Sequence, residues 1–127
     1  REIKAGKSAP LGFIEEQHDQ NTGKRVGWLP VDCADKQDQY HCEAFSNHSD
    51  GTYELCGPKV QGNPEKFEKH VLISHAEAEI LNGCPRSMEG LKSWLTGRDI
   101  EGIVFHHPDG RMAKIKLRDF KLKRKQF

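Results

Sequence analysis

Residues 100 to 117 carry two strand-like runs on either side of a tight turn, and this pattern restricts the fold more than any other part of the chain. The first run is "IEGIVF" and the second is "RMAKIKL", in which lysines alternate with apolar residues. The intervening "HHPDG" contains a Pro-Asp-Gly string, which is typical of reverse turns. The two runs therefore predict a β-hairpin.

The face on which Glu101 lies depends on how this hairpin closes. A four-residue loop pairs His106 with Arg111 and sets Lys116 opposite Glu101. Glu101, Lys114 and Lys116 then share one face of the hairpin. A type I turn followed by a left-handed glycine pairs His107 with Arg111 instead, and leaves Glu101 on the other face from the lysines. The Pro-Asp-Gly string mildly favours the second closure. We nevertheless expect Glu101 and the lysines to converge, through the four-residue loop or through a compensating bulge.

Lys114 and Lys116 alternate along the second run, so both side chains point to one face with about 7 Å between them. Two ammonium groups placed in this way repel each other unless an anion lies between them, and phosphate is an anion that lysine binds well. Glu101 is flanked by Ile100 and Ile103 and requires a cation, either a lysine or a divalent metal. The alternative is a cross-strand ion pair on a solvated face, worth roughly 0.2 to 1 kcal/mol.

The rest of the chain alternates short strands, short helices and polar loops. Residues 5–25 are expected to form a loop with at most a brief strand, and residues 32–51 a variable or disordered loop. "VGWLPV" predicts an edge strand, because Pro30 cannot donate a backbone hydrogen bond, and "TYELCG" and "HVLIS" predict two more strands. Helices are expected to begin at Asn63-Pro64 and after Ser87. The second helix is expected to bury four apolar residues at helical spacing: Met88, Leu91, Trp94 and Leu95.

These elements predict an α+β fold, with a twisted, mainly antiparallel sheet and two or three short helices, in a single domain of residues 1–127. The chain is 35% hydrophobic and 31% charged, and its mean hydropathy is −0.80. Folding at this length can bury about two thirds of the unfolded surface. We expect a missing piece or a bound partner to complete so lean a core.

The formal net charge of +1 conceals a basic tail at residues 111–127. This tail holds eight Lys and Arg residues and one acid, Asp119, an excess of seven positive charges in 17 residues. Such an excess predicts a polyanionic partner, and a solvated tail is the alternative.

The chain contains four cysteines, Cys33, Cys42, Cys56 and Cys84. No two of them form a Cys-x-x-Cys pair, which argues against a zinc ribbon. An irregular metal site with His41 and His48 is one alternative, but ordinary thiols in a reducing cytoplasm fit the spacing better. No apolar run reaches the roughly 18 residues of a membrane span, and the start of the chain lacks the hydrophobic region of a secretory signal. We therefore expect a soluble, cytoplasmic protein.

"EGIVF", the hairpin and "AKIKL" resemble the fourth and fifth motifs of the covalent nucleotidyltransferases, the superfamily of ATP-dependent ligases and mRNA capping enzymes. "TYELCG" stands where the third motif belongs. Together with "VGWLP" and "PKVQGNP", these strings resemble more closely a cellular family of RNA ligases that joins 5′-phosphate to 3′-hydroxyl RNA ends. The resemblance extends from about residue 1 to residue 124 and implies a nucleotidyltransferase (ATP-grasp-like ligase) domain.

The resemblance also implies a three-step reaction. A lysine attacks the α-phosphate of ATP to form lysyl-AMP, the AMP moves to an RNA 5′-phosphate, and the RNA 3′-hydroxyl displaces it. The implied cofactors are ATP and Mg²⁺ or Mn²⁺. By motif position, Glu54 is expected at the nucleotide ribose, Glu101 at the metal and the attacking lysine, and Lys114 and Lys116 at the α-phosphate.

Further positions follow from the same resemblance. Lys59 and Asn63 flank a turn that it places near the active site. Five basic residues are expected to hold the RNA backbone without base specificity: Arg118, Lys121, Lys123, Arg124 and Lys125.

The family's first motif, Lys-x-Asp-Gly, supplies the nucleophilic lysine and does not occur in the chain. The nearest string is "KQDQ", which lacks the glycine and follows "GWLP", so we do not assign Lys36 as the nucleophile. We expect the nucleophile to come from an N-terminal segment upstream of Arg1 or from a second polypeptide. The chain alone is then expected to be inactive.

Three functions are consistent with these patterns. The first is an ATP-dependent RNA ligase, the second is a non-catalytic nucleic-acid-binding module of the same fold, and the third is a DNA ligase or capping enzyme. The joint presence of Glu54, Glu101, Lys114 and Lys116 favours an enzyme, because a binding module would not need all four.

Overall fold

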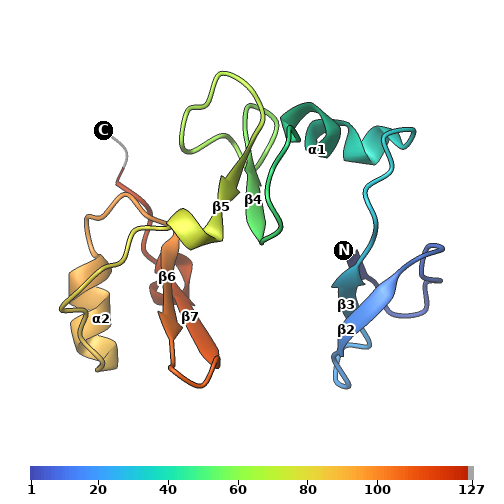
Figure 1. Cartoon of the computed structure of the whole chain (residues 1–127). Coiled ribbons are helices and arrows are strands. Elements are labelled where there is room, and N and C mark those ends of the chain that lie inside the picture. Colours follow the sequence, from blue (N-terminus) through green and yellow to red (C-terminus); the bar gives the residue numbers. More distant parts are fainter. Residues whose placement is uncertain (126–127) are drawn as a thin grey trace. The chain divides into compact units, whose positions relative to one another are not determined.

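The computed structural model describes residues 1–125 and shows a small α+β protein with antiparallel sheets and few helices (Figure 1). The expected single sheet is wrong for this part of the chain, which contains three small sheets. The first has the strand order β1 (Glu2–Ile3), β3 (Arg25–Trp28), β2 (Ile14–His18). The second pairs β4 (Tyr53–Cys56) with β5 (Val71–Ser74), and the third pairs β6 (Gly102–His106) with β7 (Met112–Lys116).

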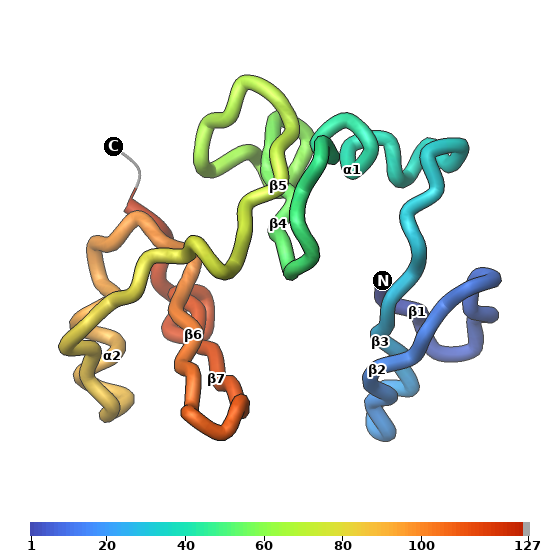
Figure 2. The backbone as a smooth tube through the Cα atoms, viewed as in Figure 1, coloured from blue at the N-terminus to red at the C-terminus, as the bar shows by residue number. Residues whose placement is uncertain are grey.

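Two α-helices and three 3₁₀ turns accompany the sheets in these 125 residues, and Figure 2 follows the chain through them. Their bounds are α1 (Gln39–Ala44), α2 (Met88–Leu95), η1 (Lys36–Asp38), η2 (His75–Glu77) and η3 (Leu117–Phe120). The chain divides into two compact units, residues 1–78 and the residues from 79 onwards. The single domain stays a prediction.

The strand at "VGWLPV" forms as β3, but it is the central strand of its sheet and not an edge. It ends at Trp28, so Pro30 lies beyond the ladder and removes no hydrogen bond from it. Strand β2 supplies the second partner within the segment expected to be mostly loop. Gly27 allows this close pairing, because a Cβ at that position would overlap the Ile14 carbonyl.

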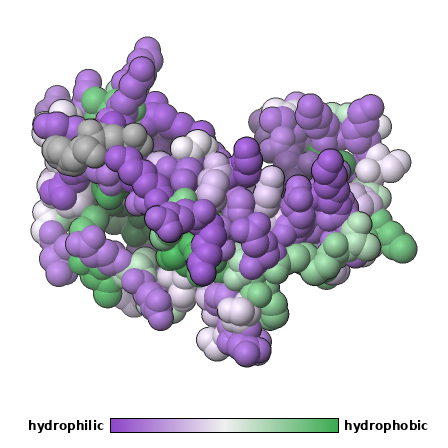
Figure 3. All heavy atoms as spheres, turned by 90° about the horizontal axis from the view of Figure 1, so that it is seen from above, coloured by the Kyte–Doolittle hydropathy of each residue, from purple (hydrophilic) through white to green (hydrophobic). Residues whose placement is uncertain are grey.

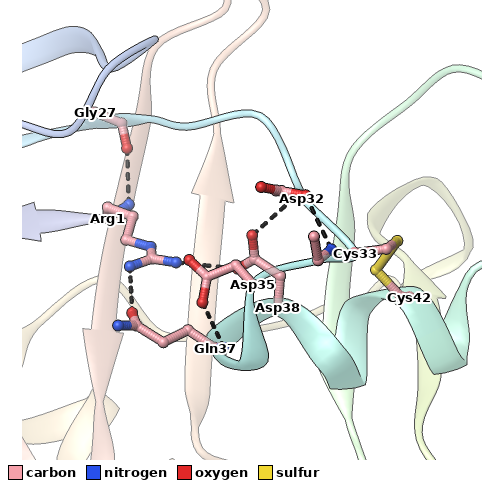
Figure 4. A network of polar contacts seen from close by, with 9 residues as sticks. Arg1, Gly27, Asp32, Cys33, Asp35, Gln37, Asp38 and Cys42 are labelled. Carbon is pink, nitrogen blue, oxygen red and sulfur yellow. Dashed lines mark hydrogen bonds and ion pairs between the residues drawn. A yellow bond between two sulfur atoms is a disulfide. The ribbon is translucent and has the colours of Figure 1, made fainter.

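The segment 32–51, expected to be a variable or disordered loop, contains η1 and α1 and is held by a polar network (Figure 4). Asp38 is buried, where one carboxylate oxygen accepts the Asp32 N–H at 2.9 Å and the other lies 3.0 Å from the Arg1 guanidinium. The Asp32 N–H, followed by the Arg1 guanidinium, lowers the pKa of Asp38 below its ordinary value of 3.8. The network ties this segment to the first sheet, because Arg1 also pairs with the backbone of Gly27.

Cys33 and Cys42 form a disulfide between the loop before η1 and helix α1 (Figure 4). The expectation of ordinary thiols is therefore wrong for these two residues, whereas Cys56 and Cys84 are free. The nine-residue separation carried no signal for this pairing, which depends on how α1 folds back onto its preceding loop. The cytoplasmic location stays a prediction, and it no longer rests on unpaired thiols at these two positions.

No helix begins at Asn63-Pro64, so this expectation is also wrong. Asn63 has a left-handed backbone, with φ of 53°, and an N-cap residue instead requires an extended backbone. Its side chain accepts the Phe67 N–H at 3.0 Å and donates to the Phe67 carbonyl at 2.8 Å. The segment between Gly57 and His70 is consequently a series of turns.

In the second unit, α2 begins as expected, with the Ser87 hydroxyl accepting the Gly90 N–H at 3.0 Å. Leu91 and Leu95 are buried, and Leu117 of η3 joins them as a buried residue. Met88 is 61% exposed, so its assignment to the core is wrong. It lies in the first turn of α2, where little of the unit covers it.

The core is as lean as the composition indicates. Among the described residues, four apolar residues are buried: Ile3, Leu91, Leu95 and Leu117. The face drawn in Figure 3 is predominantly hydrophilic. No helix among residues 1–125 has both the length and the apolar character needed to cross a membrane.

Candidate functional site

The β6–β7 hairpin closes through a tight turn and not through a four-residue loop. The His107 N–H donates to the Arg111 carbonyl at 2.9 Å, and the Gly110 N–H donates to the His107 carbonyl at 2.9 Å. Gly110 has φ of 93°, which favours glycine. The pairs are therefore Gly102 with Lys116 and Val104 with Lys114, and the four-residue closure is wrong.

Local contacts explain why the hairpin chooses this closure. The Asp109 carboxylate accepts the Arg111 N–H at 3.0 Å and the Arg111 Nε–H at 2.7 Å. The backbone N–H of Arg111 is the main reason why the pKa of Asp109 falls below its ordinary value of 3.8. The turn thus depends on an ionised aspartate and a left-handed glycine.

Glu101 and Lys116 nevertheless meet, since Glu101 precedes the first residue of β6 and is not held by the alternation of the strand. The Lys116 ammonium lies 2.6 Å from Glu101 Oε1, and the Leu117 N–H donates to the Glu101 carbonyl at 3.0 Å. The hydrogen bond from Lys116 is the largest cause that lowers the pKa of Glu101 below 4.5, with smaller contributions from Arg118 and Arg124. Glu101 is therefore an ionised carboxylate at neutral pH.

Lys114 lies on the same face of β7 as Lys116, two residues away. This face also carries Val104 and Met112, which are exposed. Within residues 1–125, the Lys114 ammonium forms neither a hydrogen bond nor an ion pair. The structure thus joins Glu101 to Lys116 directly and places Lys114 beside them as an exposed cation.

Glu54 belongs to the first unit, where it lies on β4 opposite Ile73. Its carboxylate is 60% exposed and lies 3.7 Å from His75 Nε2. Sequence reasoning did not single out His75, although its position directly after β5, the partner strand of β4, could have indicated it. The Glu54 carboxylate remains open to a ligand on this side of the β4–β5 sheet.

Part of the basic tail is exposed, and part of it is bound to the rest of the second unit. Arg118, Lys121 and Lys123 are exposed, whereas Arg124 Nε donates to Asp99 Oδ1 at 2.9 Å and its side chain is 18% exposed. The Lys125 N–H donates to the Arg98 carbonyl at 3.2 Å, so the tail returns to the segment after α2. Residues 126 and 127 of the predicted tail lie outside the described residues.

A family model described as RNA ligase 1 matches residues 42–125 of the chain, which include the β4–β5 strands, the hairpin and most of the tail. The chain belongs to the RNA ligase 1 family. It is 29% identical to RNA ligase 1 of Rattus norvegicus, over 84% of the chain and 45% of that protein. It is 30% identical to the proteins of the same name from Danio rerio, over 73% of the chain and 39% of that protein, and from Pongo abelii, over 76% and 40%. The chain therefore spans less than half the length of these relatives.

The residues of this RNA ligase 1 family member fit a divalent metal only in part. Within residues 1–125, no three His, Cys, Asp or Glu side chains lie close enough together to hold a metal ion. The irregular cysteine and histidine site is accordingly not formed. Magnesium, however, is commonly bound through one or two carboxylates with waters and substrate phosphates completing its shell. The single carboxylate of Glu101 fits that second arrangement.

Asp99 and Asp119 are acids of this region to which sequence reasoning assigned no structural role. Asp99 holds Arg124, and Asp119 Oδ2 accepts the Lys116 N–H at 2.8 Å. Asp119 therefore orders the backbone of Lys116 where β7 passes into η3. The capping position of Asp119, three residues after Lys116, was the one available signal in the sequence.

Proposed function

We propose that the chain supplies the nucleotide- and phosphate-binding part of an ATP-dependent RNA ligase that joins 5′-phosphate to 3′-hydroxyl ends. The observation that carries this proposal is the ion pair between Glu101 and Lys116, with the exposed cation of Lys114 on the same face. An ionised carboxylate beside two ammonium groups suits a reaction that moves a phosphoryl group between oxygen and nitrogen nucleophiles.

Each residue then has a separate task. Lys114 and Lys116 bind the α-phosphate and stabilise the negative charge that develops on it. Glu101 orients Lys116 and offers its second carboxylate oxygen to Mg²⁺ or Mn²⁺, which would neutralise phosphate charge when bound. Glu54, held by β4 at the surface, accepts hydrogen bonds from the ribose hydroxyls.

The RNA substrate is held by its backbone. Arg118, Lys121 and Lys123 are exposed cations in or after η3, directly after the strand that carries Lys116. Arg124 and Lys125 belong to the same tail, and Arg124 also anchors it through Asp99. These contacts involve phosphate and carry no base specificity.

The nucleophilic lysine is supplied by another segment or by a second chain, because the 127 residues contain no Lys-x-Asp-Gly string. Lysyl-AMP and RNA-adenylate intermediates then form only when that element is present. In this proposal the 127 residues alone are catalytically inactive.

Labelling with ATP tagged on its α-phosphate tests this function. We expect no covalent adduct on the 127 residues alone, and an adduct when a polypeptide with the Lys-x-Asp-Gly motif is added or fused. Adduct formation on the bare chain, mapped to Lys36, would show that the nucleophile was misassigned. RNA binding with no adduct under any condition would favour the non-catalytic binding module, and preference for nicked DNA over nicked RNA would favour a DNA ligase.

A further inference from the structure

His70 lies immediately before β5 and is buried, with 5% of its side chain exposed. Its ring is in contact with two separate parts of the first unit, helix α1 and the loop that follows β4. Tyr40 of α1 stacks on it, with ring centroids 4.1 Å apart and an interplanar angle of 20°. Glu43 of α1 lies 3.1 Å from Nδ1, and the Lys59 backbone N–H donates to Nε2 at 3.2 Å.

These contacts assign which nitrogen carries the proton in the neutral ring. A backbone N–H can only donate, so Nε2 must be the unprotonated acceptor. The proton is then on Nδ1, which donates to the Glu43 carboxylate. The same hydrogen bond is the largest cause that lowers the pKa of Glu43 below 4.5, so the acceptor stays ionised at neutral pH.

The segment held by His70 is the loop that follows β4. A Cβ at Gly57 would lie 2.5 Å from His70 Cδ2, so the backbone at the end of β4 packs directly on the ring. Beyond it, Asn63 closes a turn by donating its N–H to the Val60 carbonyl at 2.8 Å. The loop is thus held against His70 at Gly57 and Lys59 and closed by a turn at residues 60–63, although most of its side chains are exposed.

This loop begins three residues after Glu54, and Lys59 is one of its exposed residues. Within the described part of the chain, the Lys59 ammonium has no acidic partner. The ordered loop continues the strand that carries Glu54. If Glu54 contacts the ribose of a nucleotide, the Lys59 ammonium is a suitable partner for one of its phosphates.

We propose that His70 is a positioning residue of the ligase, which in its neutral Nδ1–H form holds Lys59 toward the phosphates of a nucleotide bound at Glu54. This inference rests on the proposed nucleotide site. Protonation at Nε2 would set two donors against each other and release the Lys59 N–H, so nucleotide affinity falls as His70 becomes protonated. The groups in contact with the ring are Tyr40 and Glu43 from α1 and the backbone of Gly57 and Lys59 from the loop.

The placement of the loop is tested first, without any need for activity, by NMR on the 127-residue chain with ¹⁵N-labelled histidine. We expect Nδ1 of His70 to be protonated and Nε2 unprotonated at pH 8. The Lys59 amide resonance should shift in the same pH range as the His70 ring. An Nε2–H tautomer, or a Lys59 amide that is unaffected when His70 titrates, would overturn the inference.

Calorimetric titration with ATP tests the functional consequence at pH 8 and pH 5.5. We expect His70→Phe, which keeps the stacking on Tyr40 and removes both nitrogens, to bind ATP about tenfold more weakly at pH 8, as expected when one ordering hydrogen bond is removed. Its affinity should fall less between pH 8 and pH 5.5 than the wild-type affinity does. His70→Gln retains an acceptor that does not titrate, so it should recover part of the affinity at pH 8 and show the same reduced pH dependence.

The exposed residue His18 on β2 provides the matched control, since His18→Phe should keep the wild-type affinity and pH dependence. Equal affinity of His70→Phe and wild type at pH 8 would refute the positioning role. If the wild-type chain binds no ATP at either pH, the proposed nucleotide site fails, and the NMR experiment still decides whether His70 holds the loop.

Discussion

Replacing Lys116 with glutamine should separate a catalytic role of the hairpin from a structural one. The Lys116–Glu101 pair is only partly shielded, with side chains 21% and 59% exposed. An ion pair of this exposure contributes about 0.2 to 1 kcal/mol to stability. Lys116→Gln should therefore lower the free energy of unfolding by less than about 1 kcal/mol, because the stem remains and only the charge is removed.

The effect on the reaction should be much larger. Removing one preorganised donor from a site where charge develops costs about 2.7 to 4 kcal/mol, which corresponds to a rate reduction of roughly 10²- to 10³-fold. We expect this reduction in single-turnover ligation of RNA by a ligase that contains both these residues and the nucleophile. Denaturant unfolding of the same variant provides the stability value for comparison.

Lys92→Gln is the matched control, because Lys92 is an exposed lysine on α2 in the same unit. It should change neither quantity. Lys114→Gln should reduce ligation to a similar extent as Lys116→Gln and leave stability unchanged, since Lys114 has no partner among residues 1–125. A Lys116→Gln ligase within a factor of about three of the wild-type rate would refute the phosphate-binding role and leave a surface ion pair.

The pH dependence of stability provides a second check on the same pair. The folded pKa of Glu101 is lowered from 4.5, so the unfolded chain binds its proton at a higher pH than the folded chain. The stabilisation is therefore present above about pH 4.5 and disappears as the pH falls through the folded pKa. The stability difference between the wild type and Glu101→Gln should accordingly shrink in acid.

Three further predictions concern the tail, the disulfide and the core. Replacing Arg118, Lys121 and Lys123 together with glutamine should weaken RNA binding. The slope of the logarithm of the RNA binding constant against the logarithm of the salt concentration should decrease by up to about 0.7 for each phosphate that is no longer neutralised. An unchanged slope would show that these three residues do not bind RNA. Replacing Cys33 and Cys42 with serine removes a cross-link between residues nine positions apart. It should lower the free energy of unfolding of the first unit by about 2 to 3 kcal/mol, measured by denaturant titration. No change would mean that the disulfide does not form in solution. Leu95→Ala removes a fully buried side chain and should cost the second unit about 2 to 5 kcal/mol, and a decrease below about 1 kcal/mol would contradict the core position of Leu95.

Local chemistry made several elements predictable from the sequence. The hairpin depends on neighbouring residues, since Asp109, Gly110 and Arg111 close the turn among themselves. Helix α2 depends on the Ser87 cap and on Leu91 and Leu95 at helical spacing. The sequence even reduced the hairpin to two closures, and only the contacts of Asp109 decided between them.

Features that depend on how segments pack against one another were not predictable, because no short pattern encodes which segments meet. The pairing of β3 on both sides, the Cys33–Cys42 disulfide and the burial of His70 each depend on contacts made after the chain has turned back on itself. Glu101 depends on both the sequence and the tertiary structure. The sequence indicated that its carboxylate requires a cation. Its position just outside β6, free of the alternation of the strand, is what lets it reach Lys116 in a register that would otherwise have separated them.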